Sequence, residues 1–171
     1  MPDIQKITTE YIDTEDRLRI MGEIAPSQTI VLWLTQRLLH GLMGHLCRCL
    51  DEQSSRQSHS RAMQADVMHS FAQELARAQL PAQAPVRAGS TSRQWLVTSI
   101  DVTQLAQTVI LTFKGNEPDA QASLTLHEQA LRQWLSITFA QCQKAGWPAE
   151  VWPDWLQADS QPSATAQRMI H

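Results

Sequence analysis

The sequence predicts an α+β protein built from two β-β-β-α units, with mostly antiparallel sheets and a connecting amphipathic helix. Three observations carry this prediction. Strand-like segments cluster in threes before each of two helices instead of alternating with single helices. A pattern of leucines recurs 92 positions later in the chain. The length of 171 residues suits one domain made of two similar halves.

The first unit covers residues 1–53 and opens with three predicted strands. Their residues are rich in Thr, Ile and Tyr, or alternate polar with apolar side chains, or are strongly apolar. These strands span residues 6–12, 17–21 and 29–34. The stretch 22–28 contains Pro26 and is expected to be a loop. The hydroxyl of Thr35 can cap a helix that runs to about Asp51.

Two segments lie outside the units. The connecting segment, residues 54–92, contains a Ser- and Gln-rich loop over 54–60, a helix over about 61–79 and a Pro-containing linker over 81–90. Residues 158–171 are polar and have no apolar periodicity, so we expect a disordered tail there. The helix is amphipathic because one apolar stripe recurs every four residues. The stripe consists of Met63, Val67, Phe71 and Leu75.

The second unit covers residues 93–157 and repeats the order of the first. Its predicted strands span residues 93–102, 108–114 and 121–126. A helix that opens at His127 or Glu128 reaches about Ala145. Gly146 follows at the position where a left-handed residue ends many helices, and Trp-Pro comes directly after it.

The two units share more than the order of their elements. Leu32, Leu34 and Leu39 recur as Leu124, Leu126 and Leu131. Gly22 is echoed by Gly115, and the pair Ile12-Asp13 by Ile100-Asp101. We interpret the pattern as a diverged internal duplication. The alternative is chance, because any two strand-to-helix transitions share leucines at alternating and then helical spacing.

Composition and motifs exclude several classes of protein. The formal net charge is −3 and no basic cluster is present, which disfavours a bulk electrostatic grip on nucleic acid. The phosphate-loop, dinucleotide, nucleophile-elbow and zinc-protease motifs are absent. No apolar run is long enough to span a bilayer, and the first ten residues lack the apolar core of a signal peptide.

The cysteines indicate a reducing compartment. Their number, three, is odd, and Cys47 and Cys49 are too close on a predicted helix to pair with each other. We therefore expect a cytoplasmic protein. The low share of lysine among the basic residues, together with frequent Ala and Gln, suggests a bacterial source.

Metal binding has one candidate pair. His45 and Cys49 are four residues apart on the first helix and could hold a soft cation. His40 and Cys47 lie on the other flank of that helix, so the four side chains cannot reach one ion. A structural zinc site needs four ligands. Metal is therefore disfavoured, Cys49 is expected to be a core residue, and no cofactor is predicted.

Acid–base chemistry also has only isolated candidates. Asp13 and Asp101 hold matching positions in the proposed repeat, and a pseudo-dyad could bring them together. Each is more simply a turn residue that bonds to its own backbone. His127 could be a general base, but a surface position at the start of a helix is the simpler interpretation.

The least usual segment is the tryptophan-rich stretch 147–156. It holds Trp147, Trp152 and Trp155, half of the six tryptophans in the chain. Prolines restrict its backbone, and tryptophan offers a large rigid surface, which is the profile of a partner-binding segment. The alternative is that the segment folds back over the core of its own chain.

The sequence thus favours a non-catalytic cytoplasmic interaction or assembly protein that associates with itself as a homodimer or with a protein partner. The apolar stretch 109–113 supports this interpretation because both faces of that strand carry apolar residues. One alternative is a small-ligand or metal-binding protein, possibly an enzyme, with a pocket between the units. The other is nucleic-acid binding, which would need the few arginines to converge on one face.

Overall fold

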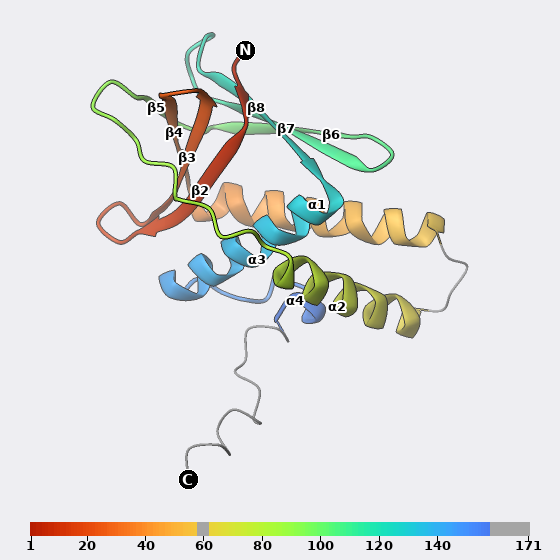
Figure 1. Cartoon of the computed structure of the whole chain (residues 1–171). Coiled ribbons are helices and arrows are strands. Elements are labelled where there is room, and N and C mark those ends of the chain that lie inside the picture. The colour runs from red at the N-terminus through yellow and green to blue at the C-terminus, as the bar shows by residue number, and fades with distance from the viewer. Residues whose placement is uncertain (58–61, 158–171) are drawn as a thin grey trace.

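The computed structural model describes residues 1–57 and 62–157. It confirms the α+β class: within these residues lie four helices and two mixed sheets of four strands each. Figure 1 shows the two sheets gathered on one side of the molecule and the helices on the other. The predicted tail, residues 158–171, lies outside the described part of the chain.

The first sheet has the order β2-β3-β4-β5. Its strands are β2 (Lys6–Ile12), β3 (Arg17–Ala25), β4 (Gln28–Leu34) and β5 (Arg93–Leu96). The pairs β2–β3 and β3–β4 are antiparallel, and β4–β5 is parallel. Alternate side chains of β3 and β4, such as Ile20 and Leu32, point into the core, as a half-buried sheet requires.

The second sheet has the order β1-β8-β7-β6. Its strands are β1 (Asp3–Ile4), β6 (Ser99–Gln104), β7 (Thr108–Lys114) and β8 (Gln121–His127). The pairs β6–β7 and β7–β8 are antiparallel, and β1–β8 is parallel. Val109, Leu111 and Phe113 of β7 are fully buried.

The two units exchange their short leading strands. β1 leads directly into β2 but pairs with β8 of the second unit, with Ile4 opposite Leu124. β5 leads into β6 but pairs with β4 of the first unit, with Trp95 opposite Leu32. Each three-stranded meander therefore receives its one parallel strand from the segment that precedes the other meander. Both sheets contribute side chains to the main hydrophobic core of the described residues.

Four helices complete the fold. They are α1 (Gln36–Gln57), α2 (Ala62–Ala78), α3 (Glu128–Ala145) and the single turn α4 (Asp154–Gln157). Thr35 caps α1 as expected, because its Oγ1 accepts a hydrogen bond from the N–H of Leu38 at 3.3 Å. Gly146 ends α3 in the left-handed conformation, with φ 71°.

The strand-to-helix transitions of the two units correspond in register. α1 begins at Gln36 and α3 at Glu128, a separation of 92 positions that equals the spacing of the leucine pattern. All six leucines of that pattern are buried. The shared architecture is compatible with a duplication, which stays a prediction.

Two other sequence echoes do not correspond in register. Gly22 pairs with Ile30, and the residue 92 positions after Ile30, Ala122, pairs with Phe113. Phe113, and not Gly115, is therefore the counterpart of Gly22. The pair Ile12-Asp13 ends β2, whereas Ile100-Asp101 lies inside β6. These two similarities are coincidental in the folded chain.

The segment 93–102 is not the single strand that the sequence predicts. It divides at Val97 and Thr98 into β5 and β6, which belong to different sheets. The N–H of Val97 donates to the carbonyl of Trp33 at 2.9 Å, and the next N–H, of Thr98, donates to the carbonyl of Lys114 at 2.8 Å. The chain thus changes sheets within one residue because its hydrogen-bond partners change.

Three smaller expectations are also corrected. The predicted loop 22–28 is a tight hairpin, since β3 continues to Ala25 and Ser27 adopts a positive φ of 64°. α1 extends to Gln57, so the predicted loop over 54–60 is helical in its described part. β1 was not expected, because two residues carry no periodicity.

The packing of Trp95 predicts the cost of filling one glycine. A Cβ added at Gly115 would lie 2.7 Å from Trp95 Cδ1, whereas a Cβ at Gly44 in α1 would meet nothing within 4 Å. We expect Gly115→Ala to lower the free energy of unfolding by roughly 1–3 kcal/mol. The control Gly44→Ala should raise it by roughly 0.5–1 kcal/mol, because alanine favours helix. Urea unfolding measures both, and equal stability of the two variants would contradict this packing.

Candidate functional site

Three features of the molecule could support a function: an open groove between α1 and β6, a buried polar cluster where the four helices meet, and an exposed apolar face on α2. The sequence predicts the apolar stripe of α2 and, as an alternative, a pocket between the units, but it gives no sign of the polar cluster. None of the helices in the described part of the chain combines the length and hydropathy that a bilayer-spanning helix needs.

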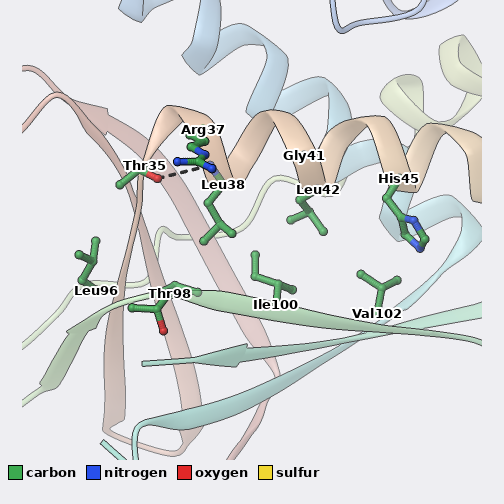
Figure 2. Close-up of a pocket in the computed structure, with 11 residues that line it drawn as sticks. Thr35, Arg37, Leu38, Gly41, Leu42, His45, Leu96, Thr98, Ile100 and Val102 are labelled. Atoms are coloured by element: carbon green, nitrogen blue, oxygen red, sulfur yellow. Dashed lines mark hydrogen bonds between the residues drawn. The ribbon is translucent and has the colours of Figure 1, made fainter. Parts of the chain in front are cut away.

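The groove lies between the first unit's helix and the second unit's leading strands. One wall is α1, and the other is the stretch from the end of β5 into β6 (Figure 2). Its volume is about 720 Å³. Its lining is mostly apolar and comprises Thr35, Arg37, Leu38, Gly41, Leu42, His45, Leu96, Val97, Thr98, Ile100 and Val102.

The charge of the groove comes from the helix side. Arg37 and His45 are exposed on α1, and among residues 1–57 and 62–157 no carboxylate belongs to the lining. Gly41 lies between them in the second turn of the helix, where a Cβ would meet nothing within 4 Å. Since glycine in a helix costs about 1 kcal/mol relative to alanine, this position keeps space open at the expense of helix stability.

The polar cluster centres on His69 of α2 and Arg132 of α3, both almost fully buried. Arg132 Nη2 lies 3.0 Å from His69 Nδ1, and Arg132 Nε donates to Glu128 Oε1 at 3.2 Å. His69 Nε2 lies 3.1 Å from Asp51 Oδ1 at the far end of α1. The ring of Trp155 stacks on the His69 ring at 5.0 Å, so one cluster joins all four helices.

The geometry of this cluster fits a neutral imidazole. Arg132 is always protonated and can only donate, so His69 Nδ1 must accept. Burial lowers the pKa of His69, and the neighbouring Arg132 charge lowers it further. The nearby carboxylates, of which Asp51 acts most, oppose these effects without reversing them. The cluster therefore holds the helices together at neutral pH and shows no arrangement for proton transfer to a substrate.

The apolar stripe predicted on α2 faces away from the protein at Val67, Phe71 and Leu75, and the side chain of Met63 lies outside the described part of the chain. Phe71 is 68% exposed and Val67 70% exposed, while the polar residues His69 and Gln73 on the opposite side are buried. Gln73 Nε2 donates to the carbonyl of Arg132 at 2.7 Å. α2 is thus attached to α3 through hydrogen bonds, and its hydrophobic surface stays accessible.

The tryptophan-rich segment packs inward. Trp147, Trp152 and Trp155 are at most 8% exposed. Trp147 contacts the ring of Tyr11 edge-on at 5.6 Å, and Trp152 contacts Phe139 at 5.1 Å. This burial agrees with the alternative that the segment covers its own core. Contact of the three tryptophans with a partner stays a prediction, and the proposals below do not use it.

The metal candidates lie in different surroundings. Cys49 is buried, as expected for a core residue, whereas His45 is exposed in the groove. Burial raises the pKa of Cys47 and of Cys142 to about 12, so these thiols stay protonated and are poor ligands. Within residues 1–57 and 62–157, no three His, Cys, Asp or Glu side chains gather as metal ligands would.

The acid–base candidates do not form a common site. Asp13 lies in the turn between β2 and β3, whereas Asp101 lies in the other sheet and forms an ion pair with Lys114. His127 Nδ1 lies 3.1 Å from the hydroxyl of Thr108. A pocket between the units that uses His127, Asp101 or His45 was one alternative from the sequence, and of these three residues His45 alone lines the groove.

Several arginines are paired with acidic residues. Arg19 forms an ion pair with Glu10, and its guanidinium lies 5.8 Å from the centre of the Trp33 ring. Arg93 lies 2.7 Å from Asp119 and 3.5 Å from Glu117. Such pairing reduces the positive potential that a nucleic-acid surface needs.

Sequence reasoning missed the polar cluster and anticipated the other two features only in part. The helical stripe that contains Phe71 was visible, but not the side of α2 that the protein covers. The groove depends on α1 and β6 coming together from distant parts of the chain, and Gly41 is its only local sign. No family model, curated protein or solved structure matches the chain. The interpretation therefore rests on this chain's own residues.

The neutral state of His69 predicts how stability depends on pH. In the unfolded chain His69 binds a proton below its ordinary pKa of 6.5, while the folded cluster resists that proton. The unfolded state then holds more protons, so the free energy of unfolding falls as pH drops below 6.5 and is maintained above it. Urea unfolding at about pH 7.5 and about pH 5.5 measures this change.

Variants assign the effect to His69. His69→Gln should lower stability at both pH values and reduce the difference between them. Burial also lowers the pKa of His40, so His40→Gln determines the share of that residue. An undiminished pH dependence in His69→Gln would show that the cluster does not control it.

Proposed function

We propose that this chain is a non-catalytic cytoplasmic interaction or assembly protein that associates with a second copy of itself through α2. The observation that carries the proposal is the exposed apolar stripe of α2, formed by Val67, Met68, Phe71 and Leu75. These side chains are 46–70% exposed, although a soluble protein gains nothing by leaving such a row in water.

The spacing of the stripe favours a second copy as its occupant. Val67 and Leu75 each lie four residues from Phe71, so the stripe is symmetric about that residue. Two copies of α2 packed antiparallel would place Phe71 against Phe71 and Val67 against Leu75 of the other copy. A two-fold interface must be self-complementary in this way.

The size of the stripe sets the expected strength. α2 has 17 residues, so it is about 25 Å long. One helix pair of that length buries less than the roughly 1,200 Å² of a standard stable interface. We therefore expect a reversible dimer with a dissociation constant on the order of 1–100 µM.

Other surfaces support this assignment. Strand β7, whose apolar residues suggested self-association, lies between β6 and β8 and is not free to pair with another chain. The buried free cysteines fit the proposed cytoplasmic location. The paired arginines and the scattered acid–base candidates give less support to nucleic-acid binding and catalysis.

Sedimentation of a concentration series tests the proposal. Phe71→Glu should abolish the dimer, because the symmetric contact would place two carboxylates in an apolar interface. Folding should be unaffected, since Phe71 is 68% exposed. The matched control is Asp66→Lys, which changes an exposed residue about 140° around the same helix.

The outcomes are distinct. A dimer that Phe71→Glu dissociates and Asp66→Lys retains supports association through α2. A monomer at all concentrations up to about 1 mM, or a dimer that survives Phe71→Glu, would reject it.

A further inference from the structure

The groove between α1 and β6 has a counterpart on the other side of the molecule. That counterpart lies between α3 and β2, and the same positions of the two units line both. A shift of 92 positions relates the helix residues Leu38, Gly41, Leu42 and His45 to Ala130, Gln133, Trp134 and Ile137. A shift of 93 positions relates the strand residues Thr98, Ile100 and Val102 to Gln5, Ile7 and Thr9.

Contacts at one end of the grooves also correspond. The N–H of Tyr11 in β2 donates to Gln141 Oε1 of α3 at 2.9 Å. At the matching positions, Gln104 Nε2 of β6 lies 3.4 Å from the carbonyl of Cys49 in α1. Each helix thus contacts the first strand of the other unit's meander through a hydrogen bond at a matching position, and the groove lies next to that contact.

In the α3–β2 groove the chain supplies its own occupant. The linker after α2 lies along that groove and contributes Leu80, Pro81, Gln83, Ala84 and Pro85 to its lining. Its two ends are fixed by hydrogen bonds. Gln129 Nε2 of α3 donates to Gln79 Oε1 at 2.7 Å, and the N–H of Val86 donates to Thr8 Oγ1 at 2.8 Å. The occupant is an extended segment with two prolines and no helix or strand.

The α1–β6 groove has the same walls without the linker. Only α1 with Thr35 and the stretch 96–102 line it. Its volume is about 720 Å³, against 460 Å³ for the α3–β2 groove, where Trp134 and Gln133 stand at the positions of Leu42 and Gly41. Its apolar floor can therefore accept a segment at least as bulky as the linker.

The charge of Arg37 indicates which residue type would suit one end of a segment bound in this groove. The position of Gln129, which binds Gln79 of the linker, corresponds to Arg37 in α1. Arg37 is exposed at the rim, and the lining holds no carboxylate that could pair with it. A segment that follows the path of the linker would place its first residue beside this guanidinium, where an acidic side chain is complementary.

We propose that the α1–β6 groove binds an extended, apolar, proline-containing segment of a protein partner, with an acidic residue at its amino-terminal end facing Arg37. Prolines suit this role because they hold a chain extended before it binds and so lower the entropy that binding costs. The groove and the exposed stripe of α2 share no residue. Binding of the segment and self-association can therefore be tested separately, and either can be wrong while the other is right.

Fluorescence anisotropy with three labelled octapeptides tests the proposal on the full chain. The first is Glu-Leu-Pro-Ala-Gln-Ala-Pro-Val, which is the linker sequence with Glu in place of its first residue; the others begin with Gln or Lys. We expect the Glu peptide to bind roughly three- to tenfold more tightly than the Lys peptide, the range for an exposed ion pair replaced by repulsion. Arg37→Glu should reverse that order.

A steric variant locates the binding site. Gly41→Trp places an indole in the groove and should weaken the Glu peptide by about tenfold or more. The matched control Gly44→Trp changes a glycine of the same helix that does not line the groove, and should bind normally. Thermal unfolding of both variants verifies that each is folded, and neither glycine has a neighbour within 4 Å of an added Cβ.

Four results would overturn the proposal. They are no binding of any peptide up to about 1 mM, equal binding of all three, binding unaffected by Gly41→Trp, and binding that strengthens when residues 158–171 are deleted. The third result would mean that the peptide displaces the linker from the α3–β2 groove. The fourth would mean that the chain's own carboxyl-terminal segment is the occupant.

Discussion

The exchange of β1 and β5 is the constraint on which the rest of the structure depends. Each of these short strands lies parallel to the last strand of the opposite meander, so Ile4 joins Leu124 and Trp95 joins Leu32. The exchange brings α1 against β6 and α3 against β2, and the main hydrophobic core takes side chains from both sheets. Both grooves exist because each helix is held against a strand that its own unit does not supply.

The two units have the same order of strands and helix, but the grooves beside their helices differ in lining. On the α3–β2 side, Trp134 stands at the position of Leu42, and the linker forms an additional wall of the groove. On the α1–β6 side, Leu42 and Gly41 leave space, and Arg37 adds a charge at the rim. The two faces of α2 also differ. Its polar face forms hydrogen bonds within the protein, and its apolar face is exposed. The proposed role in protein interactions requires accessible surfaces such as the α1–β6 groove and the exposed stripe of α2.

Local sequence patterns predicted most helices and strands. They could not predict the features that depend on contacts between distant residues. The strand-to-helix transitions around Leu34 and Leu126 follow from periodicity within a few residues, and the cap at Thr35 and the stop at Gly146 are local too. The break at Val97 depends on Trp33 and Lys114, which lie far away in the sequence. The orientation of α2 depends on contacts with Arg132, whose guanidinium lies against His69 and whose carbonyl accepts a hydrogen bond from Gln73. The groove residues look unremarkable in sequence, because the groove is formed by α1 and β6, which lie far apart along the chain.

Because Asp3 and Ser123 are neighbours in a sheet, the order of synthesis has a consequence for folding. Translation at about 5–20 residues per second separates the emergence of these two residues by roughly 6–24 s. Until residues 93–96 emerge, the first meander lacks its parallel strand β5, and the edge of β4 stays unpaired. The core that both units share forms only after the second meander has been made. The native fold is therefore reached late, when the second sheet can accept the strand that was made first.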